Sequence, residues 1–89
     1  MPYVKQEKRQ RLNPKIQSLC AELCELKHKK GNLNYTISML IKHHIECVGP
    51  SYDTLSDITG VLNDVKMEFE RKVVSKYEDE KIAENGPVY

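Results

Sequence analysis

The sequence has 89 residues, of which 30% are charged and 39% are hydrophobic, and its formal net charge is +1. This length predicts one domain over residues 1–89, near the lower limit of what a single core stabilises without disulfides, metal or a partner chain. The small net charge argues against a generic nucleic-acid binder, and no apolar run approaches the roughly 20 residues of a membrane span. The first residues also lack the apolar core of a signal peptide, so we expect a cytoplasmic protein.

The charge is distributed unevenly between the two ends of the chain. Residues 1–15 contain five basic residues and one acidic residue, whereas residues 76–89 contain two basic and four acidic residues. The two ends therefore either attract each other, within a subunit or between subunits, or form two solvated polar faces.

The first helix is predicted over about residues 14–29, after a basic segment over 1–12. Asn13 is a good cap and Pro14 suits the first helical position, where its missing N–H loses no bond. Gly31 is the expected left-handed stop. The apolar stripe of this helix comprises Ile16, Leu19, Cys20, Leu23 and Leu26.

A second helix is predicted over about residues 33–47, capped by Asn32 or Asn34 and ended by Gly49-Pro50. Its inner face comprises Leu33, Ile37, Leu40, Ile41, His44, Ile45 and Val48.

The third predicted helix, over about residues 52–74, carries the longest helical pattern and begins at a Ser51 cap. Its apolar positions, here called the seam, are spaced three, four, three and four apart, as in a coiled coil. We expect core packing over residues 55–65 and a subunit interface from Phe69 onward. Gly60 permits close approach of a neighbouring backbone, either within the chain or from another subunit. The seam consists of Leu55, Ile58, Leu62, Val65 and Phe69.

A short fourth helix is predicted over about residues 76–85, where Ser75 and Glu78 have the spacing of a capping box. The third helix running straight through is the alternative, and we favour a bend at residue 75. Residues 86–89 are expected to dock as an apolar tip. No stretch alternates as a strand does, so the fold class is all-α, a small bundle of three main helices and one short one that we expect to self-associate.

Three stretches carry a resemblance: GNLNY at residues 31–35, ITGVL at 58–62 with VKMEFERKV at 65–73, and YEDEKIAENGPVY at 77–89. Together they resemble an uncharacterised family of short helical bacterial and phage proteins. Typical members have Pro at the position of Lys76, which makes the bend less certain in this chain. An acid at the position of Pro87 and Arg at the position of Lys72 are also typical. The resemblance implies a phage or prophage context, with a host-cell cytoplasmic location, and brings no catalytic residue.

Catalysis and metal binding find little support. No phosphate-binding loop, zinc-protease motif or nucleophile elbow is present, so we expect no enzyme and no cofactor. A zinc site can be drawn from Cys20, Cys24, His43 and His44, but buried cysteine and hydrogen-bonded histidine are ordinary core residues, so no metal is expected. The acidic run at residues 78–84 lacks the spacing of a calcium loop.

Nucleic-acid binding is also disfavoured. Lys5, Lys8, Arg9 and Arg11, with Tyr3, would suit phosphates, but the acidic tail would repel them. No helix-turn-helix spacing is evident.

The favoured function is a non-enzymatic homo-oligomer with a binding site between subunits. Five tyrosines against one phenylalanine favour rings that stack on a ligand, and basic residues near them suit an anionic, nucleotide-like small molecule. With the phage resemblance, the concrete hypothesis is a counter-defence protein that sequesters a nucleotide-derived immune signal. The predicted ligand-binding residues are Arg9, Arg11, Tyr35, His43, Arg71, Lys72, Tyr77 and Tyr89. The predicted interface residues are Leu62, Val65, Phe69, Val73, Val88 and Tyr89.

The alternative is a protein-protein interaction module. It would inhibit or adapt a host enzyme through the seam or through the acidic C-terminal face, whose carboxylates would mimic phosphates. A ligand-sequestering oligomer should concentrate basic and aromatic groups in a concave site, whereas an inhibitor should expose an apolar or acidic patch.

Overall fold

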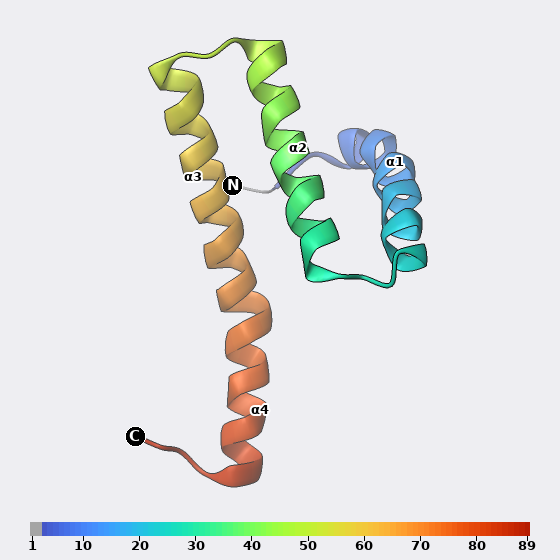
Figure 1. The fold of residues 1–89 in the computed structure, drawn as a ribbon. Helices are drawn as coiled ribbons and strands as arrows, with labels where there is room; N and C mark the ends of the chain where they lie inside the picture. The colour runs from blue at the N-terminus through green and yellow to red at the C-terminus, as the bar shows by residue number, and fades with distance from the viewer. Residues whose placement is uncertain (1–2) are drawn as a thin grey trace. The chain divides into compact units, whose positions relative to one another are not determined.

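The computed structural model describes residues 3–89, and every regular element among them is helical, which confirms the all-α prediction. Figure 1 shows the helices in chain order. They are α1 (Gln6–Glu25), α2 (Lys30–Val48), α3 (Tyr52–Phe69), a π-helical turn η1 (Glu70–Val74) and α4 (Ser75–Asn85). Residues 1–2 of the predicted basic segment lie outside the described residues.

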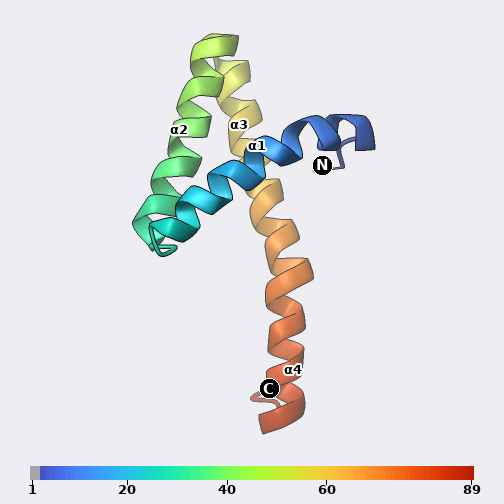
Figure 2. The same ribbon diagram turned by 90° about the vertical axis from the view of Figure 1, so that its right-hand side faces the viewer.

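The described chain forms two compact units. The first comprises residues 3–55 and contains α1, α2 and the first turn of α3. The second, residues 56–89, contains the rest of α3, the π turn, α4 and the C-terminal tail. Within the first unit, α1 and α2 are joined by a short loop, which Figure 2 shows where blue turns to green. Each unit thus offers its own helix faces.

The predicted start of the first helix is wrong. Helix α1 begins at Gln6 and carries Pro14 in its interior, so the basic segment from residue 6 onward is helical. Residues 6–12 are mostly strong helix formers, and the Arg9 Nε–H donates to the Val4 carbonyl just before the helix. They extend the helix N-terminally even though Pro14 removes one backbone hydrogen bond, a loss of about 3 kcal/mol.

The end of α1 also differs from the prediction, because Gly31 is not its stop. Lys27 and His28 adopt positive φ angles of 66° and 51°, and the helix ends at Glu25. The N–H of His28 donates to the Leu23 carbonyl at 2.9 Å and that of Lys27 to the Cys24 carbonyl at 2.9 Å, the pattern of a Schellman cap. These bonds satisfy the last carbonyls of α1 and offset the strain of left-handed non-glycine residues. Gly31 instead lies in the first turn of α2.

The predicted asparagine caps of the second helix are wrong as well. Helix α2 starts three residues earlier than predicted, and its cap position is Lys29. The Asn32 carbonyl accepts a bond from the Thr36 hydroxyl at 2.8 Å, inside the helix. The predicted end is confirmed within one residue, since Gly49 follows the helix with a φ of 99°.

The Ser51 cap of α3 is confirmed. The Thr54 N–H donates to Ser51 Oγ at 3.1 Å, and the hydroxyls of Ser51 and Thr54 lie 3.1 Å apart. Thr54 is 6% exposed, and these local hydrogen bonds satisfy polar groups at the start of α3.

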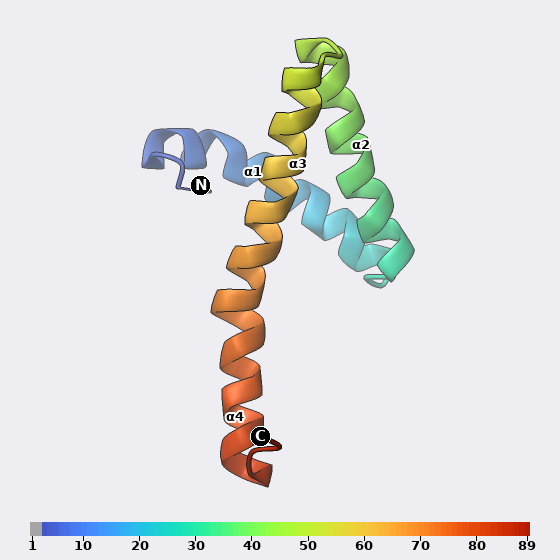
Figure 3. The same cartoon turned by 90° about the vertical axis from the view of Figure 1, so that its left-hand side faces the viewer.

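The long helix does not restart at residue 75. Val74 and Ser75 both have right-handed helical backbone angles, so the chain stays helical from Tyr52 to Asn85, as Figure 3 shows from yellow to red. The Ser75 N–H and hydroxyl both donate to the Glu70 carbonyl, the hydroxyl at 2.9 Å. The Ser75 side chain therefore bonds backward and stabilises the π turn, instead of bonding forward as in the predicted capping box.

Within residues 3–89 no apolar side chain is buried, and the predicted core over residues 55–65 is wrong for the single chain. Leu55, Leu62 and Val65 are all exposed, and Ile58 is half-buried. The helical pattern was identified correctly, but none of its apolar side chains is buried within residues 3–89.

Gly31→Ala tests the position of Gly31. Its φ is not positive, and an added Cβ would meet no atom of the described chain within 4 Å. Alanine should raise the free energy of unfolding by about 0.5–1 kcal/mol, measured by urea unfolding with circular dichroism.

Gly49→Ala is the matched control, because the φ of Gly49 is 99°. That substitution should lower the free energy of unfolding by about 1 kcal/mol or more. Destabilisation by Gly31→Ala would instead place Gly31 in a left-handed stop.

Candidate functional site

The predicted ligand-binding residues fall into two sets, one on each unit. Those of residues 3–55 lie on two helices, and those of residues 56–89 lie along the π turn, α4 and the tail. All are exposed except Arg9, which is half-buried. The first set is Arg9 and Arg11 on α1 with Tyr35 and His43 on α2; the second is Arg71 and Lys72 in η1, Tyr77 on α4 and Tyr89 in the tail.

Tyr35 and His43 line one hollow of about 270 Å³, here called the α1–α2 hollow. His43 Nδ1 lies 3.5 Å from a Glu46 carboxylate oxygen, so an acid accompanies its ring. The volume is below the roughly 300–1,000 Å³ of small-molecule sites, which fits an inserted side chain better than a nucleotide. The sequence prediction omitted the apolar members of the hollow, although positions 35, 39 and 43 share a helix face. The other residues that line the α1–α2 hollow are Leu19, Thr36, Met39 and Leu40.

A larger hollow of about 560 Å³ lies where the tail follows α4, and Tyr89 is part of its wall. Beside it, Lys81 Nζ lies 5.4 Å from the centroid of the Tyr77 ring, within range of a cation–π interaction. Lys81 was not predicted, although its four-residue spacing from Tyr77 is visible in the sequence. This C-terminal hollow is lined by Glu78, Lys81, Ile82, Asn85, Gly86, Pro87, Val88 and Tyr89.

The electrostatics of the C-terminal hollow do not by themselves favour an anion. It lies at the C-terminal end of α4, where the helix dipole is negative, and Glu78 is in its wall. The Lys81 ammonium is 3.2 Å from a Glu84 carboxylate oxygen. Arg71 is likewise paired with Glu68 at 3.4 Å. An anionic ligand at this hollow therefore requires further cations from outside residues 56–89.

The π turn changes which residues continue the seam. In an uninterrupted α-helix, Lys76 would follow Phe69 at a spacing of seven and lie in line with the seam. The extra residue of a π turn rotates all later side chains by about 100°. Tyr77 consequently takes the place of Lys76, and Val73 lies closer to the seam than Lys72. The exposed apolar face thus extends into α4.

The predicted interface residues are all exposed in the single chain, as an interface requires, and their interface role stays a prediction. Phe69 is 55% exposed, and Leu62, Val65 and Val73 are exposed to similar extents. Val88 and Tyr89 of the C-terminal tip are more exposed still, so docking of the tip on another surface also stays a prediction. An added Cβ at Gly60 would meet no atom of the described chain within 4 Å, so both alternatives for its close approach stay predictions.

A family model described as a domain of unknown function, DUF6899, matches residues 1–88. The chain belongs to the DUF6899 family. No curated protein and no solved structure matches it. Membership confirms the expected relation to an uncharacterised family, and DUF6899 brings no activity or site residue to this chain.

Two further features of the DUF6899 chain concern candidate sites. Across residues 3–89 no group of three or more His, Cys, Asp or Glu side chains is placed to hold a metal ion, and Cys20, Cys24 and Cys47 are free and exposed. No helix in the same range has both the length and the apolar character needed to cross a membrane.

Phe69→Ala tests the seam. Because Phe69 is 55% exposed, its truncation should change the stability of a single chain by less than about 1 kcal/mol, whereas loss of a central aromatic anchor should weaken self-association about tenfold or more. Sedimentation equilibrium measures the association constant.

Met67→Ala is the matched control, because Met67 is 58% exposed and lies two residues away, on nearly the opposite side of α3. It should leave association within about threefold of the wild type. Equal losses from the two substitutions would contradict a specific seam interface.

Proposed function

We propose that this chain is a non-enzymatic binding protein that acts as a homo-oligomer. The observation that supports this is the exposure of the large apolar side chains of the long helix from Val61 to Tyr77, among which Val74 alone is half-buried. An isolated helix gains little stability in water, and helices in proteins are stabilised mainly by packing of an amphipathic face. A second copy is the partner always available to each chain.

The proposed ligand is an anionic, aromatic small molecule of the nucleotide type, bound where subunits meet. All five tyrosines are exposed and are available to stack on a base. Tyr77, Lys81 and Tyr89 form the aromatic and cationic part of the site at the C-terminal hollow. The missing cations come from Arg9 and Arg11 of a second copy, on the basic start of α1, where the helix dipole also favours anions.

In its most concrete form, this function is phage counter-defence. The resemblance to short bacterial and phage proteins supports this proposal, because a phage protein gains from removing a nucleotide-derived immune signal. Sequestration of such a signal needs a preorganised site and sufficient protein, with no catalytic step. The protein would then act in the host-cell cytoplasm.

The second candidate is a protein-protein module that inhibits or adapts a host enzyme. The exposed seam favours it, since apolar surface of this extent is typical of protein interaction sites. The exposed carboxylates of Glu78, Asp79 and Glu80 on α4 supply the acidic surface of this candidate.

Native mass spectrometry of protein purified from infected or defence-activated cells tests the proposal. We expect an oligomer that carries a stoichiometric small-molecule adduct. A host protein that co-purifies without an adduct would support the second candidate, and a monomer that binds neither would contradict both.

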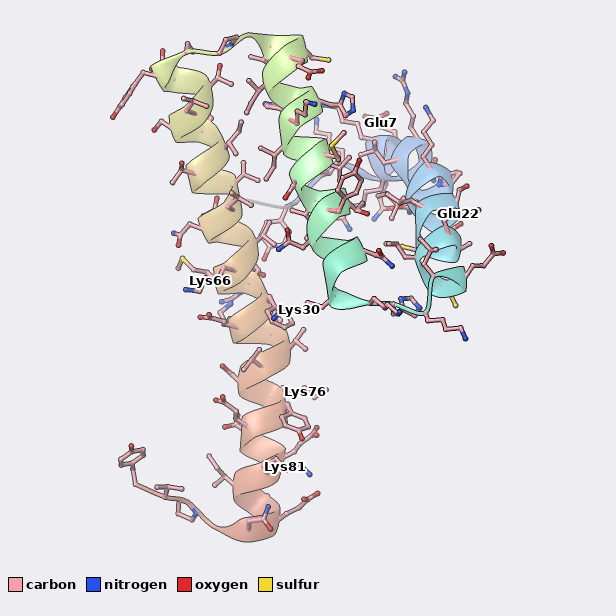
Figure 4. The ribbon with its side chains drawn as sticks, viewed as in Figure 1. Glu7, Glu22, Lys30, Lys66, Lys76 and Lys81 are labelled. Carbon is pink, nitrogen blue, oxygen red and sulfur yellow. The ribbon has the colours of Figure 1, made fainter. Side chains whose placement is uncertain are left out.

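Two lysine variants sharpen the experiment. Lys81→Ala should lose most of the adduct, because the Lys81 ammonium lies at the Tyr77 ring. Lys66→Ala is the matched control. Figure 4 shows Lys76 and Lys81 on one side of the long helix and Lys66 on the opposite side. Equal adduct loss from both variants would argue against a site at the C-terminal hollow.

A further inference from the structure

We infer that the seam of the long helix of one copy docks into the α1–α2 hollow of a second copy. The inference rests on the self-association in the proposed function. It goes further because it names the two surfaces that meet, and these two surfaces differ from each other. The docking face consists of the seam residues from Leu62 to Phe69 and of Val73 and Tyr77, which continue the same face. The hollow lies wholly within residues 3–55.

The hollow has the chemistry of a seat for a helix face. Its wall is mainly apolar, with Leu19 from α1 facing Met39 and Leu40 from α2. Its polar members are the Tyr35 hydroxyl, the Thr36 hydroxyl, which already donates to the Asn32 carbonyl, and His43 beside Glu46. A volume of about 270 Å³ suits one or two inserted apolar side chains.

The seam has the complementary shape. Leu62, Val65 and Phe69 lie at alternating spacings of three and four on one side of α3, as the projecting side chains of helix packing do. The π turn keeps this face apolar past Phe69, because Tyr77 replaces Lys76 in line with it. A lysine at that position would place a charge over the hollow.

Charge favours contact between unlike units. Residues 3–55 contain nine Lys and Arg residues and five Asp and Glu residues. Residues 56–89 contain five Lys and Arg residues and eight Asp and Glu residues. Two units of the same kind therefore repel each other, because their net charges have the same sign. A 3–55 unit and a 56–89 unit attract each other. This argues against seam-to-seam pairing and for seam-to-hollow pairing.

The proposed contact is heterologous, since the two surfaces differ. Each copy offers one seam and one hollow, so contacts continue from copy to copy until a ring closes. A closed ring would repeat the same junction between neighbouring subunits, including any ligand site formed there.

A complementation experiment on the full-length chain tests this pairing. Leu40→Asp places a charge in the hollow and leaves the seam intact, whereas Val65→Asp does the reverse. Both side chains are more than half exposed in the single chain, so neither substitution removes a side chain packed inside a subunit. Sedimentation velocity of each variant and of their 1:1 mixture measures association.

Each variant alone should associate at least about tenfold more weakly than the wild type, a loss of about 1.4 kcal/mol. The mixture should form a dimer, because the seam of the Leu40→Asp chain still fits the hollow of the Val65→Asp chain. If the wild type assembles but the 1:1 mixture does not, this inference is overturned and the self-association in the proposed function still stands. A monomeric wild type would overturn both.

Salt dependence gives a second measurement. Attraction between units of opposite charge predicts weaker wild-type association as NaCl rises from about 0.05 to 0.5 M. Association that strengthens over that range would indicate contact between like-charged surfaces and overturn the pairing.

Discussion

Unburied apolar surface is the constraint on which the structure of this chain depends. From Tyr52 to Asn85 the backbone stays helical over about 50 Å, and most apolar side chains along this helix remain exposed, with Ile58 and Val74 half-buried. Hydrogen bonds within a helix contribute little net stability, because water satisfies the same groups in the unfolded chain. Burial of the seam against another surface is therefore what stabilises the long helix, and self-association is the simplest means.

The other features follow from this constraint. The π turn at residues 70–74, held by Ser75, keeps the exposed face apolar into α4 instead of rotating two lysines onto it. The excess of basic residues in 3–55 and of acids in 56–89 then distinguishes the two candidate halves of a contact. The exposed tyrosines Tyr52 at the start of α3 and Tyr89 in the tail lie outside the seam, where a ligand can bind without displacing it. One set of helices thus serves both assembly and binding.

The sequence predicted the helices more accurately than their ends. The seam and the Ser51 cap are visible in residue spacing, and the structure confirms a helix and a cap there. The helix start predicted from Pro14 was wrong, because the helix-forming residues before it extend α1 to Gln6. The stop predicted at Gly31 was wrong, because a Schellman cap with Lys27 in the left-handed conformation ends α1 earlier. No sequence rule indicated the π turn, since Ser75 bonds to a carbonyl five residues earlier. Tyr35 and His43 were predicted together, but their apolar neighbours and Lys81 were not, and the single-domain prediction stays a prediction.

The central claim is that a second copy stabilises this chain, and thermal unfolding across a dilution series tests it most directly. When subunits associate only in the folded state, the unfolding midpoint depends on protein concentration. The account predicts a midpoint that rises steadily from low to high micromolar chain concentration, together with a mass above that of a monomer by light scattering. A midpoint independent of concentration, with a monomeric mass throughout, would contradict it.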